Sequence, residues 1–143
     1  MRDMTQIEII DFIKYFTWGT LIGVEGDRPY AVELSYGFDG TYIYCGSMPG
    51  GRMSRCIRDN AKVAFKICEC DWSYSRFRAV IVEGHAERMT SREDIMHAVT
   101  QIARQRKLPD HAFAGVADRL VGNAESNSLR IPVITVGGKI AGY

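Results

Sequence analysis

Two alternating segments joined by an Asp-Gly turn constrain this chain more than any other feature. Residues 30–36 place their large apolar side chains on one face and Ala31, Glu33 and Ser35 on the other. Residues 41–47 follow Asp39-Gly40, a dipeptide that favours a β-hairpin between two such segments. The sequence therefore predicts two neighbouring antiparallel strands here.

The rest of the chain continues with strands joined by short connections. Apolar spacing predicts further strands over 20–24, 62–70, 77–88 and 129–136, and helices over 5–19, 52–59, 90–106 and 111–120. Thr5 with Glu8, and Thr90 with Glu93, have the spacing of capping boxes. Strands and helices do not alternate as in a parallel sheet, so we predict an α+β fold of mainly antiparallel strands, closed or nearly closed into a barrel with helices outside.

Length and composition indicate one globular domain over residues 1–143. Hydrophobic residues make up 46% and charged residues 24% of the chain, which is typical of a folded protein. The net charge of +1 argues against an electrostatically driven nucleic-acid binder. We find no apolar run long enough to cross a membrane and no export signal at the N-terminus, so we expect a cytoplasmic protein.

The four cysteines do not have the spacing of a disulfide framework. Cys68 and Cys70 lie two apart on a predicted strand, so both thiols face the same way. A metal site would need further ligands, and the three histidines have no recognised metal-binding spacing. Reduced thiols without a metal are the favoured interpretation.

The segment from Cys45 to Arg55 has the composition of an anion-binding turn. A strand ends at Gly46-Ser47, the pair Gly50-Gly51 follows, and a helix begins with Arg52 and Arg55 near its start. The N–H groups and positive dipole end of a helix N-terminus favour a phosphate, and arginine adds a bidentate donor. The alternative is a plain glycine turn into a surface helix whose arginines are solvated.

Other residue types give weaker signals. The chain contains no established nucleophile motif, and no carboxylate pair has the spacing for acid–base catalysis. His85 is interpreted as a surface or structural residue of its strand. Trp72, Tyr74 and Phe77 form an aromatic group that could cover a flat ring or pack beneath a loop.

Several segments, in order, resemble the flavin-binding split-barrel family of pyridoxamine 5'-phosphate oxidase, and most of all its nitroimidazole-resistance branch. The segments that carry the resemblance are Pro29–Tyr44, Ser47, Gly51-Arg52, Ile57–Asn60, Lys62–Phe65 and Val80–Ala86. The likeness covers most of residues 5–138 and is strongest over 29–86.

The resemblance implies a six-stranded split β-barrel of Greek-key type with flanking helices. It also implies a homodimer that binds two FMN molecules at the subunit interface and transfers electrons to or from a small-molecule redox substrate. A non-catalytic flavin or haem carrier or sensor with the same barrel is the alternative. An aromatic face is a candidate for pairing with a second copy, and it consists of Tyr30, Tyr36, Tyr42 and Tyr44.

The resemblance implies the cofactor site residue by residue. The strand Ala31–Tyr36 would lie along the flavin ring, and Ser47 near the phosphate. The family's basic pair falls on Arg52 and Met53, so Arg55 or another cation would compensate for Met53. The complete implied site is Glu33, Leu34, Ser35, Tyr36, Gly46, Ser47, Gly51, Arg52, Met53, Arg55 and Trp72.

The sequence also departs from the family. A family histidine is replaced by Gly46, and a family glutamine falls near Ala79. The missing histidine argues against nitroreduction of the drug type. The substrate-binding residues of the oxidase cannot be identified near the C-terminus, so oxidation of pyridoxamine phosphate is also unsupported.

Overall fold

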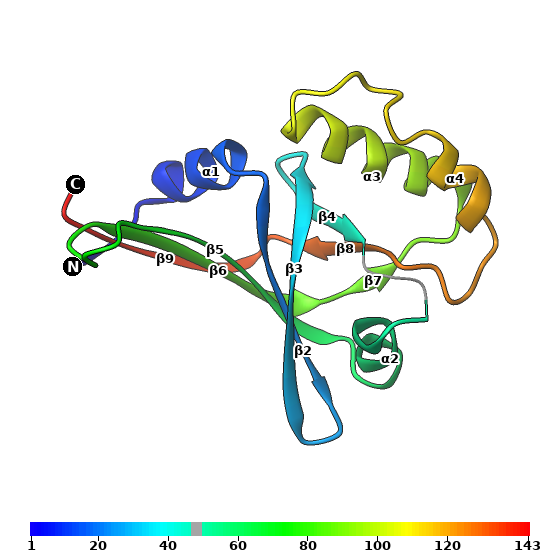
Figure 1. Cartoon of the computed structure of the whole chain (residues 1–143), viewed down its shortest axis with the longest axis horizontal. Helices are drawn as coiled ribbons and strands as arrows, with labels where there is room; N and C mark the ends of the chain where they lie inside the picture. Colours follow the sequence, from blue (N-terminus) through cyan, green and yellow to red (C-terminus); the bar gives the residue numbers. More distant parts are fainter. Residues whose placement is uncertain (47–49) are drawn as a thin grey trace.

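A computed structural model describes residues 1–46 and 50–143 of the chain (Figure 1). Ser47, for which the resemblance implies a phosphate contact, lies outside the described residues. The elements are β1 (Arg2–Asp3), α1 (Gln6–Tyr15), β2 (Trp18–Glu25), β3 (Arg28–Phe38), β4 (Tyr42–Gly46), α2 (Arg52–Asp59), β5 (Lys62–Cys70), β6 (Phe77–His85), β7 (Glu87–Arg88), α3 (Arg92–Gln105), α4 (Gly115–Leu120), β8 (Ser128–Pro132) and β9 (Thr135–Ala141).

The strands pair throughout in antiparallel fashion, in the order β1-β9-β6-β5-β2-β3-β4-β8-β7. Strand β3 joins the two parts of this sheet, because Arg28–Ser35 pairs with β2 whereas Tyr36–Phe38 pairs with β4. Helix α1 lies beside β5, β6 and β9, while α3 and α4 lie beside β4 and β8 (Figure 1). The predicted α+β, antiparallel split-barrel fold is confirmed, with nine strands in the described part of the chain instead of six.

The predicted strand 129–136 is two strands. Residues of β8 pair with β4, whereas those of β9 pair with β6, so the chain crosses from one part of the sheet to the other after Pro132. The sequence pattern missed most of β9 because Gly137-Gly138 is unfavourable in a strand. Gly138 packs closely there, because a Cβ at this position would lie 2.7 Å from the sulfur of Met4 and displace that side chain.

Helix boundaries match the prediction at one end and differ at others. Thr5 and Glu8 form the predicted capping box of α1. Helix α3 is capped by Ser91, whose hydroxyl accepts from the backbone N–H of Asp94 at 3.1 Å, so the predicted cap at Thr90 is wrong by one residue. Gly19 belongs to β2 and does not end the first helix, which stops at Tyr15.

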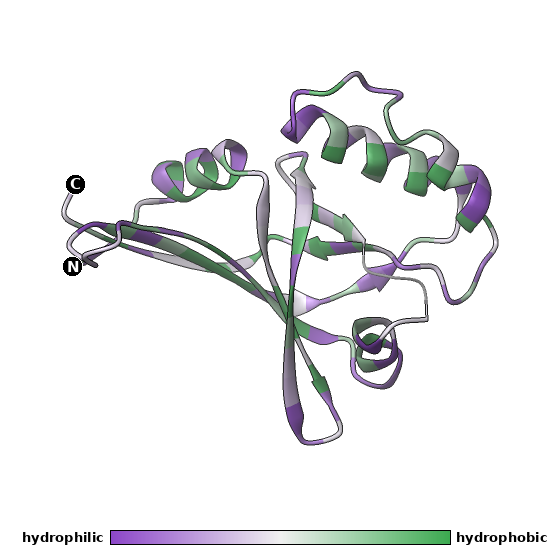
Figure 2. Cartoon of the chain, in the orientation of Figure 1, coloured by the Kyte–Doolittle hydropathy of each residue, from purple (hydrophilic) through white to green (hydrophobic). Residues whose placement is uncertain are grey.

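Buried side chains form two clusters. One lies inside the barrel, and the other lies between β4 and helices α3 and α4. Tyr36 is 0% exposed in the first cluster, where its hydroxyl donates to the carbonyl of Ile13, and Tyr44 is 3% exposed in the second. The prediction that the tyrosine face pairs with a second copy is therefore wrong for these two residues, since the chain itself covers them. Apolar residues line the side of α3 that faces the sheet (Figure 2).

Close backbone contact positions α3 against the sheet. A Cβ at Gly37 would lie 2.5 Å from the backbone nitrogen of Ile102, so glycine allows the helix backbone to touch β3. A hydrogen-bond network fixes the same helix to the β3–β4 turn. Asp39 accepts from the hydroxyl of Tyr44 at 2.6 Å and lies 2.9 Å from Nε2 of His97.

Replacing Gly37 by alanine tests this close packing. Because the added methyl group would push against backbone atoms, we expect G37A to lower the free energy of unfolding by about 1–3 kcal/mol. Urea unfolding followed by circular dichroism measures the change. G137A is the control, since a Cβ at that strand position meets nothing within 4 Å. Equal effects of the two substitutions would contradict the packing argument.

The Asp39 network predicts a pH dependence. Partial burial raises the pKa of Asp39, but hydrogen bonds from Tyr44, the Tyr42 backbone and His97 outweigh it and bring the pKa to about 2. A carboxyl with a lowered pKa stabilises the fold above its unfolded pKa and loses that contribution as the pH falls. Between about pH 4 and pH 2, wild type should lose on the order of 1 kcal/mol more stability than D39N. Parallel stability profiles of the two proteins over this range would refute the network's role.

Candidate functional site

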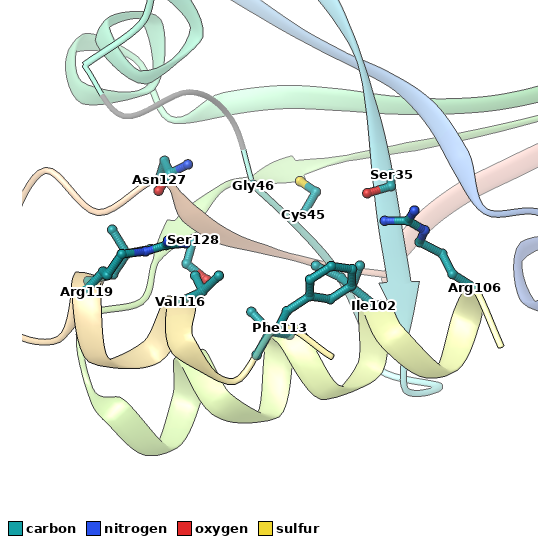
Figure 3. Close-up of a pocket in the computed structure, with 12 residues that line it drawn as sticks. Ser35, Cys45, Gly46, Ile102, Arg106, Phe113, Val116, Arg119, Asn127 and Ser128 are labelled. Carbon is teal, nitrogen blue, oxygen red and sulfur yellow. The ribbon is translucent and has the colours of Figure 1, made fainter. Parts of the chain in front are cut away.

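A cavity of about 340 Å³ lies between the sheet and helices α3 and α4 (Figure 3). Strands β3 and β4 contribute Ser35, Cys45 and Gly46, and the segment leading into β8 contributes Asn127. The apolar wall consists of Val99, Ile102, Phe113, Val116 and Leu120. The volume of the cavity falls in the range of small-molecule sites, and its lining combines apolar side chains with a few polar groups.

The charged side chains that line the cavity are two arginines, Arg106 and Arg119, and no acidic residue lines it within the described chain. Neither arginine has an ion pair among residues 1–46 and 50–143, whereas Arg104 nearby pairs with Asp110 at 2.9 Å. The guanidinium of Arg106 instead lies 5.4 Å from the ring centroid of Phe113. The cavity is therefore positively charged.

One polar atom in the cavity wall lacks a partner. The side-chain oxygen Oδ1 of Asn127 is buried and accepts no hydrogen bond from the residues that the structure describes. Asn127 lies against Gly46, where a Cβ would be 3.4 Å from the Asn127 carbonyl oxygen. A buried acceptor without a donor is costly.

The cysteine thiol in the cavity wall is in its neutral form at neutral pH. Cys45 is fully buried, and burial raises the pKa of its thiol to about 12. The thiolate is the nucleophilic form of cysteine, so Cys45 at neutral pH is not a nucleophile.

The start of α2 brings a second group of arginines together. The Nε of Arg52 donates to the carboxylate of Glu25 at 3.1 Å, and its guanidinium lies 4.2 Å from the ring centroid of Tyr30. Arg55 donates to the carbonyl of Gly50 at 3.3 Å and lies 3.9 Å from the same carboxylate. Glu25 thus balances only part of the charge of these two arginines.

Arg88 adds a third cation to this region. Its guanidinium donates to the hydroxyl of Ser54 at 3.0 Å, to the Ser54 carbonyl and to the Ser126 carbonyl at 2.6 Å. All three acceptors are neutral, and no carboxylate pairs with Arg88 in the described part of the chain. The sequence analysis missed this residue, because its partners lie 34 and 38 positions away.

The structure brings some of the predicted site residues together. Ser35 and Gly46 line the cavity, and Gly51, Arg52 and Arg55 stand at the start of α2. No sequence pattern marked Arg106, Arg119 or Asn127, because their positions depend on how α3 and α4 pack.

Other predicted site residues lie elsewhere. The side chains of Tyr36 and Met53 are buried in the barrel core, so only their backbone can meet a ligand, and the half-buried side chain of Leu34 packs against the same core. Glu33 is exposed and accepts from the hydroxyl of Thr20 at 2.8 Å. Trp72 is 99% exposed in the β5–β6 turn and lines no part of the cavity, so within one chain it neither covers a ring there nor packs beneath a loop.

No group of three or more His, Cys, Asp or Glu side chains in the described residues could hold a metal ion. No helix that the structure describes combines the length and apolarity needed to cross a membrane.

The antiparallel barrel, the change of partner along β3 and the cavity beside it define a split-barrel protein. Residues 6–139 match the model of the pyridoxamine 5'-phosphate oxidase family, so the chain belongs to this family. The resemblance stated from the sequence is confirmed.

Solved structures with the same fold span nearly the whole chain. A candidate 5-nitroimidazole antibiotic resistance protein of Bacteroides thetaiotaomicron has a TM-score of 0.80 at 18% identity, over 97% of this chain and 86% of its own. An FAD-binding protein of Mesorhizobium loti has a TM-score of 0.69 at 22% identity, over 99% of this chain and 98% of its own.

A curated relative matches a shorter stretch. An uncharacterized protein of Rhizobium meliloti (strain 1021) is 32% identical over 71 residues, which are 50% of this chain. The matched stretch is 46% of that protein, so the chain spans about half the length of the curated relative that it matches.

Proposed function

We propose that this protein binds FMN and uses it to transfer electrons to or from a small molecule. The observation that carries the proposal is the charge at the start of α2. Three arginines, Arg52, Arg55 and Arg88, belong to or contact the first four residues of this helix. Among the described residues, Glu25 is the carboxylate that pairs with Arg52 and Arg55, and Arg88 has only neutral partners. This excess of positive charge suits the phosphate of a flavin nucleotide.

The residues present fit the rest of the cofactor. Ser35 and the exposed side of β3 would lie along the ring system, and Gly46, with no side chain, would leave room between the ring and the phosphate. The bound flavin supplies the redox chemistry, while the chain holds and orients it. This division of roles agrees with the neutral thiol of Cys45 and the lack of a nucleophile motif.

Family membership supports the remaining parts of the proposal. We infer a homodimer, as the resemblance implied, with a flavin at each subunit interface. The four cysteines are free thiols, which agrees with the proposed cytoplasmic location, where thiols stay reduced. FMN is proposed over FAD because the resemblance to the pyridoxamine 5'-phosphate oxidase family implies FMN, although the Mesorhizobium loti protein binds FAD by its description.

The protein as purified provides the first test. An absorbance spectrum with a flavin band near one equivalent per chain, and the mass of FMN in the released ligand, are the expected results. A released mass of FAD would correct the nucleotide, and a colourless protein that takes up neither nucleotide would refute flavin binding. Bleaching of the flavin by NADH or NADPH under anaerobic conditions would distinguish an enzyme from a carrier.

Substitution of Arg52 tests the phosphate contact. Because R52A removes a charged donor, we expect the dissociation constant of FMN to rise by about tenfold or more. Fluorescence titration of FMN into the protein measures it. R58A is the matched control, since Arg58 lies at the far end of α2 and pairs with Asp59 at 3.2 Å. An unchanged affinity in R52A, or an equal loss in R58A, would contradict the assignment.

A further inference from the structure

The cavity beside Ser35 holds a positive charge that the described chain does not balance. Most other arginines near α3 and α4 have acidic partners, for example Arg92 with Asp118 at 3.0 Å. Arg106 and Arg119 have none among residues 1–46 and 50–143, yet both line the same cavity. Guanidinium groups that face a cavity without a carboxylate favour an anionic ligand.

The two arginines lie at opposite ends of the cavity. Arg106 follows the last turn of α3, Arg119 lies near the end of α4, and their side chains enter from the two ends (Figure 3). Ile102, Phe113 and Val116 form the apolar surface between them. A ligand with one anionic group would contact one guanidinium and leave the other without a partner. A ligand with an anionic group at each end and an apolar middle would suit the whole cavity.

We propose that this cavity binds a small dicarboxylate, with one carboxylate at Arg106 and the other at Arg119. A planar guanidinium donates two parallel hydrogen bonds to a carboxylate, which fixes each end of the molecule. The binding itself requires only the cavity.

The experiment is calorimetric titration of the full chain, as purified, with straight-chain dicarboxylates from succinate to suberate. Each is compared with the monocarboxylate of the same chain length. The second carboxylate would pair with the second guanidinium. We therefore expect the dicarboxylate of one chain length to bind about tenfold or more tighter than the monocarboxylate of that length. Equal affinities within every pair, or no binding by any dicarboxylate, would overturn the proposal.

Variants assign the two ends. R106Q and R119Q should each weaken binding of the tightest-binding dicarboxylate by about tenfold. The remaining affinity should equal that of the monocarboxylate of the same chain length. R104Q is the matched control, because Arg104 lies on the same helix and pairs with Asp110 outside the cavity. Circular dichroism establishes that each variant folds. A dicarboxylate that binds R106Q or R119Q as tightly as wild type would refute the two-ended arrangement.

Flavin content, measured on the same samples, separates this proposal from the proposed function. Dicarboxylate binding by a protein that takes up no flavin would support the cavity assignment and refute flavin binding. A flavin-bound protein that binds no dicarboxylate would refute the cavity assignment alone.

Discussion

Strand β3 changes its hydrogen-bonded partner between Ser35 and Tyr36, and the rest of the molecule is arranged around this point. The first part of the strand completes one part of the sheet with β2, and the last part begins the other with β4. Tyr36 anchors the change, since its buried ring packs against Phe65 and its hydroxyl is bonded to Ile13. Ser35, the neighbouring residue, faces the opposite way and lines the cavity.

The sequence predicted what depends on short-range patterns. Alternation over residues 30–36 located the inward and outward faces of β3, and Thr5 with Glu8 located the first helix. Patterns did not reveal where one strand passes between two partners, because this depends on pairing with distant segments. For this reason the sequence pattern predicts one strand over residues 129–136, where the structure has β8 and the start of β9. The two glycines of β9 further weakened the strand pattern.

The candidate site divides in the same way. Arg52 and Gly46 were found because they flank a glycine-rich turn that can be seen in the sequence. Arg88, Arg106 and Arg119 could not be distinguished from surface arginines, because what sets them apart is the lack of a nearby carboxylate in the described fold. Met53 shows the reverse case, because its place beside Arg52 implied a ligand contact and its side chain instead packs on Gly23.

Arg88 connects the start of α2 to the wall of the cavity by hydrogen bonds. Its guanidinium is bonded at once to α2, through Ser54, and to the segment before β8, through Ser126. The same segment supplies Asn127 to the cavity wall. Arg88 therefore fixes the spacing between α2 and this wall while its own charge has only neutral acceptors. A lysine in this place would keep the charge but lose the planar fork that spans both segments.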